Sequence, residues 1–322
     1  MTKNFGSILA HFIEGKIGGT RILSGSNRKF FRIFEHSNFV VMLDQNRDEA
    51  ARYVNLLKKL YSLNIPVPQV FAFDDSSGAL LLEDIGKISL FDWYRSTGDF
   101  EPHLRAAEIL ARIHYLNKDE ISPISDFDYW DFLYETQYFT RHFLIGYCGF
   151  TENIENILED EFVLLANLAS RSPKGFMHRD YQSQNIFVAN TGVKIVDFQG
   201  ARFGFRAYDL ASLIEDPYLN LPYSTKVALI NEYLEKSDLS PQEKLELLEY
   251  YPYNAIQRLL QATTAFAYLS KIAGKDWFEK FIISALERAK NLLRLNIDKF
   301  PTLLKILNEA KMRVSKYAIT YY

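Results

Sequence analysis

Residues 176–200 read FMHRDYQSQNIFVANTGVKIVDFQG. Two short apolar runs, 186–188 and 193–196, flank the polar triplet 190–192, which ends in glycine. Because glycine readily adopts the positive φ that tight loops require, this pattern predicts a β-hairpin with a three-residue loop. The segment before the hairpin has no periodicity and is expected to be a loop.

Polar side chains lie at both ends of this hairpin. Asn185 lies six residues before Thr191, and Asp197 lies six residues after it, so the two are expected to face each other about 5 Å apart. An amide oxygen and a carboxylate are the hard ligands that Mg²⁺ prefers when water and phosphate complete its coordination. Asp180, on the preceding loop, could orient an attacking hydroxyl or accept its proton. Phosphoryl transfer needs little more than such groups.

The spacing H-x-D-x-x-x-x-N followed by I-V-D-F resembles a known family. It is similar to the aminoglycoside phosphotransferase and choline kinase group, which are small-molecule relatives of the protein kinases. His178, Asp180 and Asn185 match the catalytic loop of the kinases, H-R-D-x-x-x-x-N. Asp197 matches the aspartate of D-F-G, with Gln199 in place of the glycine. The resemblance covers nearly the whole chain, although the helical tail lacks the A-P-E segment of the protein kinases themselves.

Within that group the chain looks most like the anomeric amino-sugar kinases of bacterial cell-wall recycling, which act on N-acetylmuramate and N-acetylglucosamine. The shared features are R-D-Y before Asn185, D-F-Q at 197–199, Y-D-L-A-S-L at 208–213 and the pair Gln257–Arg258 in a late helix. The resemblance implies transfer of the γ-phosphoryl group of ATP, with Mg²⁺, to a hydroxyl of such a sugar. The acidic run 159–161 could help a cationic acceptor, so aminoglycosides and choline stay open as alternatives.

The resemblance also implies roles for individual residues. Asp180 would orient or deprotonate the acceptor hydroxyl, while Asn185 and Asp197 would hold Mg²⁺. His178 and Asp209 would be structural residues that brace the catalytic loop. Three further groups would bind ligands: Gly25, Ser26, Asn27 and Arg28 would cover the ATP phosphates, Glu83 and Ile85 would present backbone groups to adenine, and Gln199, Arg202 and Arg258 could contact the substrate.

One residue of the kinase pattern is missing. The kinases carry a phosphate-binding lysine on their third strand, but here that strand, 39–43, reads FVVML. The candidate replacements are Arg28, Lys29, Arg32 and Arg47. The missing lysine motivates a rival hypothesis, a catalytically weak kinase-like module that binds nucleotide. Retention of the catalytic-loop and metal positions favours an enzyme.

Hydrophobic periodicity divides the chain into two parts. Residues 1–86 contain a short amphipathic helix, five strand-like runs and a second helix inserted after the third run. Segment 83–86 resembles a hinge, and residues 87–322 are mostly helical apart from the hairpin region. We therefore expect an α+β, protein-kinase-like fold with two lobes: 1–86 binds nucleotide, and 87–322 carries the catalytic loop and the substrate site. The cleft between them is the expected ligand site.

The composition excludes several classes of protein. The 322 residues are 48% hydrophobic and 24% charged, which is typical of a globular chain and excludes general disorder. A net charge of -3 argues against a dedicated nucleic-acid binder. The single cysteine, Cys148, excludes an intrachain disulfide and a cysteine-rich zinc site. Without a signal peptide or a long apolar segment, we expect a soluble, cytoplasmic protein with no membrane partner. The sequence leaves the oligomeric state open.

Overall fold

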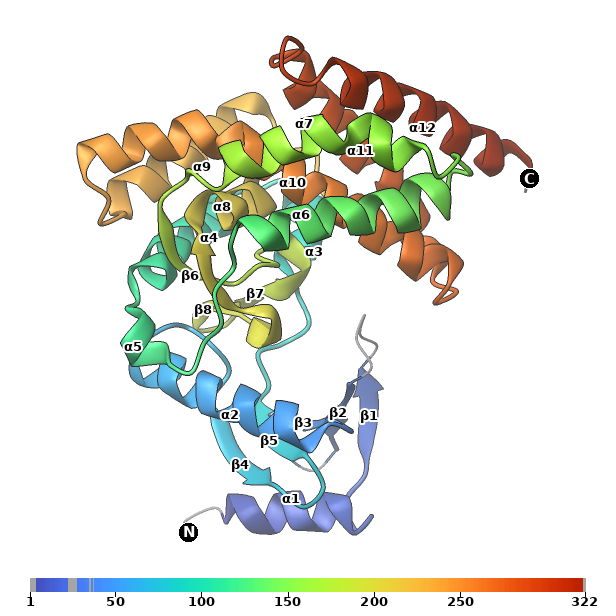
Figure 1. Cartoon of the computed structure of the whole chain (residues 1–322). Helices are drawn as coiled ribbons and strands as arrows, with labels where there is room; N and C mark the ends of the chain where they lie inside the picture. The colour runs from blue at the N-terminus through green and yellow to red at the C-terminus, as the bar shows by residue number, and fades with distance from the viewer. Residues whose placement is uncertain (1–3, 23–27, 35, 37, 321–322) are drawn as a thin grey trace.

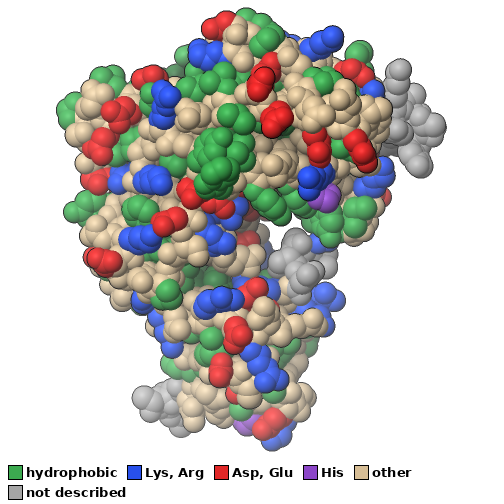
Figure 2. Space-filling view, in the orientation of Figure 1, with side chains coloured by type: hydrophobic (Ala, Val, Ile, Leu, Met, Phe, Trp, Pro, Cys, Tyr) green, Lys and Arg blue, Asp and Glu red, His purple; other side chains and the backbone are tan. Residues whose placement is uncertain are grey.

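The structure is a computed structural model, and it describes residues 4–22, 28–34, 36 and 38–320. Figure 1 shows a small N-terminal part around one sheet and a larger, mostly helical part. The space-filling view in Figure 2 shows a hollow where the two parts meet. Within the described residues, no helix has the length and apolar character needed to cross a membrane.

The N-terminal part is built on an antiparallel sheet of five strands in the order β1-β2-β3-β5-β4. Its elements are α1 (Phe5–Ile13), β1 (Gly19–Ile22), β2 (Lys29–Ile33), β3 (Phe39–Leu43), α2 (Arg47–Ser62), β4 (Val70–Asp74) and β5 (Ala79–Glu83). Helix α2 lies between the third and fourth strands in chain order, as predicted. It begins where the side chain of Asn46 accepts a hydrogen bond from the N–H of Glu49.

Each face of this sheet has its own hydrophobic cluster, because side chains alternate between the two faces of a strand. Val41 and Leu81 pack in one cluster with Leu9 of α1. Met42 belongs to the other cluster, which includes Leu57 of α2. That second cluster continues into the helical part, so α2 joins the sheet to the rest of the molecule.

The helical part is arranged around one long central helix, α10. Its α-helices are α3 (Leu90–Thr97), α4 (Glu101–Tyr115), α5 (Lys118–Ile121), α6 (Tyr129–Tyr138), α7 (Ile154–Ala169), α8 (Arg206–Ile214), α9 (Tyr223–Lys236), α10 (Pro241–Lys271), α11 (Glu279–Arg294) and α12 (Pro301–Thr320). A π-helix, η1 (Phe139–Ile145), continues α6 directly, and η4 (Asp276–Phe278) is a short 3₁₀ turn. Helix α10 packs against α6, α7, α8 and α11.

Four short strands and two 3₁₀ turns support the loops between these helices. They are β6 (Lys174–Met177), η2 (Ser183–Asn185), β7 (Ile186–Ala189), β8 (Gly192–Ile195), η3 (Phe198–Gly200) and β9 (Arg202–Phe205). β7 pairs with β8, and β6 pairs with β9, which places Gly175 opposite Gly204. The architecture is α+β, as predicted. The pairing of β6 with β9 was not predicted.

Candidate active site

The catalytic loop runs from the end of β6 to the start of β7, and a buried carboxylate from α8 holds its first residues. Asp209 accepts hydrogen bonds from the backbone N–H groups of His178 (2.5 Å) and Arg179 (2.8 Å). Its side chain is fully buried, and His114 lies 3.4 Å away. Arg179 has a left-handed backbone with a φ of 73°. These bonds therefore hold an unusual turn directly before Asp180.

His178 connects the loop to the hairpin. Its Nε2 lies 2.8 Å from the carbonyl oxygen of Val196, and its Nδ1 accepts a hydrogen bond from the N–H of Asp180 (3.2 Å). Because Nδ1 accepts, the proton lies on Nε2 and is donated to Val196. The ring is fully buried and packs edge-on against Phe198, with ring centroids 4.4 Å apart. Both ring nitrogens are thus engaged by the backbone.

Three side chains donate hydrogen bonds to the carboxylate of Asp180. Gln182 Nε2 (2.9 Å) and Asn185 Nδ2 (2.8 Å) donate to Oδ2, and Arg258 Nη2 donates to Oδ1 (2.6 Å). The side chain of Asp180 is still 43% exposed. Because the carboxylate is fixed in direction yet open to solvent, a hydroxyl group could reach it.

The hairpin has a different register from the predicted one. β7 and β8 pair Ala189 with Gly192, so the loop contains two residues rather than three. Gly192, with a φ of 109°, belongs to the strand and not to the loop. Asn185 therefore lies opposite Val196, whose N–H donates to its carbonyl oxygen (3.0 Å). The predicted pairing of Asn185 with Asp197 across the strands is wrong by one residue.

Asp197 reaches the site through its own backbone conformation. It follows β8 with a left-handed φ of 70°, a region that aspartate tolerates better than most residues. Burial raises the pKa of Asp197, and the nearby Asp180 carboxylate raises this pKa further, while His178 and Arg28 lower it. Two carboxylates thus act on each other here, and a bound cation would favour the ionised form of both.

The donor set fits Mg²⁺. Asn185 Nδ2 donates to Asp180, so Asn185 Oδ1 is the side-chain atom left to bind a cation. Asp197 would supply a carboxylate. Nowhere in the described residues do three His, Cys, Asp or Glu side chains gather as a metal site. One carboxylate and one amide oxygen leave room for water and phosphate, which Mg²⁺ usually retains.

The residues predicted to bind nucleotide are only partly described. Gly25, Ser26 and Asn27 lie outside the described residues. Arg28 lies in the ion pair with Asp44 (Nε to Oδ2, 2.6 Å), with its guanidinium 4.8 Å from the ring centroid of Tyr53. Of the basic residues considered as replacements for the missing lysine, Arg28 is the one that acts on the pKa of Asp197.

The segment predicted to be a hinge, 83–86, begins at the end of β5. The N–H of Glu83 donates to the carbonyl oxygen of Gln69 (2.9 Å), and its side chain pairs with Lys194 of β8 (3.0 Å). Asp84 pairs with Arg32 of β2. The backbone N–H and C=O of Ile85 have no hydrogen-bond partner among the described residues. Ile85 thus keeps both backbone groups available to a base, whereas the N–H of Glu83 is used within the sheet.

The three predicted substrate contacts differ in their surroundings. Gln199 is exposed, and Arg202 donates to the carbonyl oxygen of Ala201 (2.8 Å). Burial, followed by repulsion from Arg179, lowers the pKa of Arg202. Arg258 is buried and donates to Asp180 itself, so it holds the carboxylate that was predicted to be catalytic.

Two important carboxylates were missed from the sequence. Glu135 of α6 accepts from Arg179 (3.0 Å) and from the hydroxyl of Tyr208 (3.0 Å). Asp216 accepts from the N–H of Ser183 (2.8 Å) within the loop. Both lie more than 30 residues from their partners, outside any motif, so no local signal could have found them.

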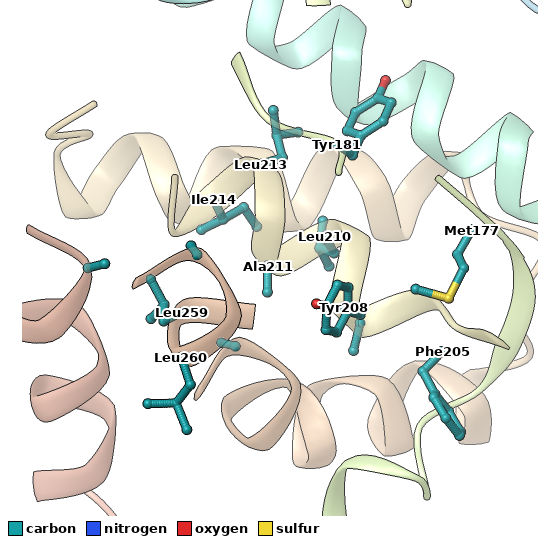
Figure 3. Close-up of a cluster of buried hydrophobic side chains, with 14 of the residues drawn as sticks. Met177, Tyr181, Phe205, Tyr208, Leu210, Ala211, Leu213, Ile214, Leu259 and Leu260 are labelled. Atoms are coloured by element: carbon teal, nitrogen blue, oxygen red, sulfur yellow. The ribbon is translucent and has the colours of Figure 1, made fainter. Parts of the chain in front are cut away.

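A buried hydrophobic cluster supports the loop from below. Figure 3 shows side chains from β6, β9, α8 and α10 in this cluster. Its labelled members are Met177, Tyr181, Phe205, Tyr208, Leu210, Ala211, Leu213, Ile214, Leu259 and Leu260. Tyr181, directly after Asp180, is fully buried and donates from its hydroxyl to the carbonyl oxygen of Ala106 (2.8 Å). The residues on both sides of the loop are therefore fixed in the core.

Comparison with known proteins identifies the family. A model described as the phosphotransferase enzyme family matches residues 19–236, which is more than half of the chain. The chain belongs to this family. Membership of the phosphotransferase enzyme family confirms the predicted resemblance and the predicted class of enzyme, a phosphotransferase with an alcohol group as acceptor.

Curated relatives and solved structures agree with this assignment. An N-acetylmuramate/N-acetylglucosamine kinase of Pseudomonas aeruginosa is 26% identical over 288 residues, which covers 84% of each chain. A kinase of the same name from Neisseria meningitidis is 25% identical over 280 residues, or 83% of each chain. A choline/ethanolamine kinase family protein from Mesorhizobium loti has a TM-score of 0.62 at 16% identity, covering 91% of this chain and 93% of its own. The aminoglycoside phosphotransferase APH(2'')-Ib with ADP bound has a TM-score of 0.61 at 14% identity, covering 90% and 99%. These structures confirm the predicted kinase-like α+β fold.

Proposed function

We propose that this phosphotransferase is an ATP- and Mg²⁺-dependent sugar kinase that phosphorylates a hydroxyl of an N-acetylated amino sugar, such as N-acetylmuramate or N-acetylglucosamine. The observation that carries the proposal is the arrangement at Asp180, whose half-exposed carboxylate is held by Asn185 and Arg258 beside Asp197. The sugar class rests on the names of relatives that align with more than four-fifths of the chain.

In the proposed reaction, Asp180 accepts a hydrogen bond from the acceptor hydroxyl and directs its oxygen at the γ-phosphorus of ATP. The new O–P bond forms as the bond to the leaving ADP oxygen breaks, and the hydroxyl proton passes to Asp180. Arg258 and Asn185 keep the carboxylate in place while this happens. Positioning supplies much of the rate in reactions of this class.

The phosphates need positive charge near Asp197. Asn185 Oδ1 and the carboxylate of Asp197 would hold Mg²⁺, which would offset the charge that develops on the phosphoryl oxygens. We assign Arg28 the role of the missing third-strand lysine, because it is the candidate that acts on Asp197. Ile85 would present its free backbone groups to the adenine ring.

An ADP-release assay with ATP and Mg²⁺ tests this function. The acceptors are N-acetylmuramate, N-acetylglucosamine, other hexoses, choline and kanamycin. We expect turnover with an N-acetylated amino sugar, a loss of at least about 1,000-fold in kcat in Asp180→Asn, and no turnover after chelation of the metal. The matched control is Asp298→Asn, because the side chain of Asp298 is 76% exposed.

Each other outcome has a defined meaning. Turnover with kanamycin or choline alone would retain the kinase and reject the sugar. Full activity in Asp180→Asn would reject the role of the catalytic loop. Nucleotide binding without turnover of any acceptor would favour the rival hypothesis of a binding module.

A further inference from the structure

A row of aromatic side chains lies on α6 and its π-helical extension, with Tyr134 and His142 exposed and Tyr138 half-buried between them. Tyr134, Tyr138 and His142 are spaced four residues apart, so they share one face of the helix. The rings of Tyr134 and Tyr138 stack with centroids 6.3 Å apart, and those of Tyr138 and His142 are 4.2 Å apart. Tyr268 of α10 is close enough to raise the pKa of Tyr138, after burial and Tyr134. We name Tyr134, Tyr138, His142 and Tyr268 the aromatic strip.

Most of the strip is open to solvent. Tyr134 is 66% exposed and Tyr268 is 49% exposed, while Tyr138 is half-buried. Figure 2 shows hydrophobic side chains gathered over α6, above the hollow between the two parts of the molecule. A folded domain normally exposes large rings singly, so a row of adjacent rings that are exposed or half-buried indicates a binding surface.

The strip is continuous with the reaction centre. Tyr138 follows Glu135 by three residues, which places their Cβ atoms about 5–6 Å apart. Glu135 binds Arg179, the residue before Asp180. On α10, Tyr268 lies ten residues beyond Arg258, a rise of about 15 Å along the helix. Each helix of the strip therefore also carries a residue that holds the loop of Asp180, Glu135 on α6 and Arg258 on α10.

The backbone of this segment is also unusual. The π-helix η1 contains His142 and begins directly after Tyr138. A π-helix has more residues per turn than an α-helix, so residues four apart come closer to the same side of the axis. The close contact between Tyr138 and His142 follows from this geometry. Such segments are rare, and they occur often at functional sites.

The charges around the strip disfavour a cation. The carboxylate of Glu135 is already occupied by Arg179 and Tyr208. Asp131 accepts a hydrogen bond from the N–H of Asp128 (2.8 Å). A quaternary ammonium ligand would therefore find rings, but the charge of Glu135, the residue next to Tyr134, is already balanced by Arg179. Tyrosine rings with hydroxyls at their rim suit a ligand that has both apolar C–H faces and hydroxyl groups, as a saccharide does.

We propose that the aromatic strip is a second saccharide subsite, which binds a further sugar unit attached to the one that is phosphorylated. The rise of about 15 Å along α10 from Arg258 to Tyr268 supports this, because it exceeds the span of one pyranose ring. The inference rests on the proposed function, since it requires a sugar acceptor. The acceptor would then be an oligosaccharide, with its reactive sugar at Asp180 and its next unit on Tyr138 and Tyr134.

The test compares N-acetylglucosamine with its β-1,4-linked disaccharide as acceptors. We expect kcat/KM to be at least tenfold higher for the disaccharide in the wild-type enzyme. The double variant Tyr134→Ala/Tyr138→Ala should remove this advantage and leave kcat/KM for the monosaccharide within about twofold. Tyr138→Phe keeps the ring and should retain most of the advantage. The matched control is Tyr223→Ala on α9, where the side chain is 83% exposed.

The outcomes separate this inference from the proposed function. Turnover of the monosaccharide with no preference for the disaccharide would overturn the subsite and retain the sugar kinase. A preference that survives the double variant would also overturn it. Absence of turnover with either sugar would reject the proposed function and the inference together. Inhibition of turnover by tetramethylammonium that disappears in the double variant, without any preference for the disaccharide, would overturn the subsite and indicate a cation site instead.

Discussion

Arg179 stands directly before the proposed catalytic residue with a left-handed backbone. For a residue with a side chain, this conformation costs about 1–2 kcal/mol. The hydrogen bonds that the N–H groups of His178 and Arg179 donate to Asp209 offset that cost, and Glu135 accepts from the Arg179 guanidinium. Unusual backbone that the surroundings enforce is common at functional sites. The Asp180 side chain that follows this turn is 43% exposed, so its carboxylate is both held and accessible.

Arg258 is the residue we expect to control the position of Asp180. Its three donors contact Asp180 (2.6 Å), Ser212 (2.8 Å) and Gln261 (2.5 Å). Burial lowers the pKa of Arg258, but Asp180 and other acidic groups more than compensate, so its pKa lies above the usual value. A hydrogen bond to a charged group contributes about 1.5–3 kcal/mol, so Arg258→Met should lower kcat about 10- to 100-fold.

The split between kcat and KM distinguishes positioning from folding. In Arg258→Met, KM for ATP should stay within about threefold, because none of the hydrogen bonds that Arg258 makes within the described residues goes to a residue proposed to bind nucleotide. Arg258→Lys keeps the charge but cannot form the three-way fork, so its kcat should lie between those of the wild type and Arg258→Met. Equal loss of kcat in the Lys and Met variants, with melting temperatures unchanged, would contradict the proposed role.

Strand β6, which pairs with β9, leads directly into the loop that contains Asp180. Gly175 and Gly204 lie directly opposite each other in this pair. A Cβ on Gly204 would lie 2.6 Å from the sulfur of Met177 and 2.8 Å from the Cβ of Phe127. Gly204→Ala should therefore lower the free energy of unfolding by about 1–3 kcal/mol, which is the usual cost of overpacking. Urea denaturation of the variant measures this change.

A second glycine provides a control for which the expected change in the free energy of unfolding is an increase. Gly6 lies inside α1, and a Cβ there would meet only the side-chain oxygen of Asn4 at 3.5 Å. Gly6→Ala should stabilise the protein by about 0.5–1 kcal/mol, because alanine loses less entropy in a helix. If Gly204→Ala is as stable as the wild type, the β6–β9 pair must be looser than the structure describes.

Helices and strands were predictable from the sequence, whereas pairings between segments that lie far apart in the chain were not. The amphipathic helix α1 and the insertion of α2 follow from local periodicity. Helix α8 shows no helical period in the sequence, because all of its residues, Arg206–Ile214, are buried and it has no polar face. The hairpin was predicted, but its register was wrong because Gly192 could serve in the loop or in the strand.

The site shows the same division between local and distant information. The positions of Asp180 and Asn185 follow from spacing within one loop, and the structure brings their side chains together. The contact of Arg258 with Asp180 spans 78 residues, and that of Glu135 with Arg179 spans 44. Neither partner carries a local sign of where the other will lie. Such contacts depend on how α6 and α10 pack, which periodicity does not determine.

The two parts of the molecule are joined by an ion pair and a side-chain hydrogen bond as well as by the packing of α2. Lys194 of β8 pairs with Glu83 at the end of β5 (3.0 Å), and both side chains are largely buried. Lys59 of α2 donates to the carbonyl oxygen of Ser122. Since the same hydrophobic cluster extends from the sheet through α2 to α10, we expect the whole chain to unfold in one cooperative transition.

This cooperative stability should depend on pH through His103. The ring lies fully buried on α4, edge-on to Tyr94 with ring centroids 5.4 Å apart. Neither ring nitrogen has a hydrogen-bond partner within the described residues. Burial lowers the pKa of His103 from 6.5 to about 4, despite the opposing charge of Asp99. Between these two values the unfolded chain binds a proton that the folded chain does not, so the free energy of unfolding falls as the pH falls.

His103→Phe isolates this contribution, because phenylalanine retains the ring contact and cannot bind a proton. From pH 7 to pH 5 the wild type should lose about 2 kcal/mol more unfolding free energy than the variant. Urea denaturation at both pH values measures the difference, in which the carboxylates common to both proteins cancel. Above pH 7 the difference in unfolding free energy between the wild type and His103→Phe should stay constant. The imidazole of His103 is then neutral in both the folded and the unfolded wild type. Parallel losses from pH 7 to pH 5 would mean that His103 gains a proton in the folded state, and hence that α4 opens to water near Tyr94.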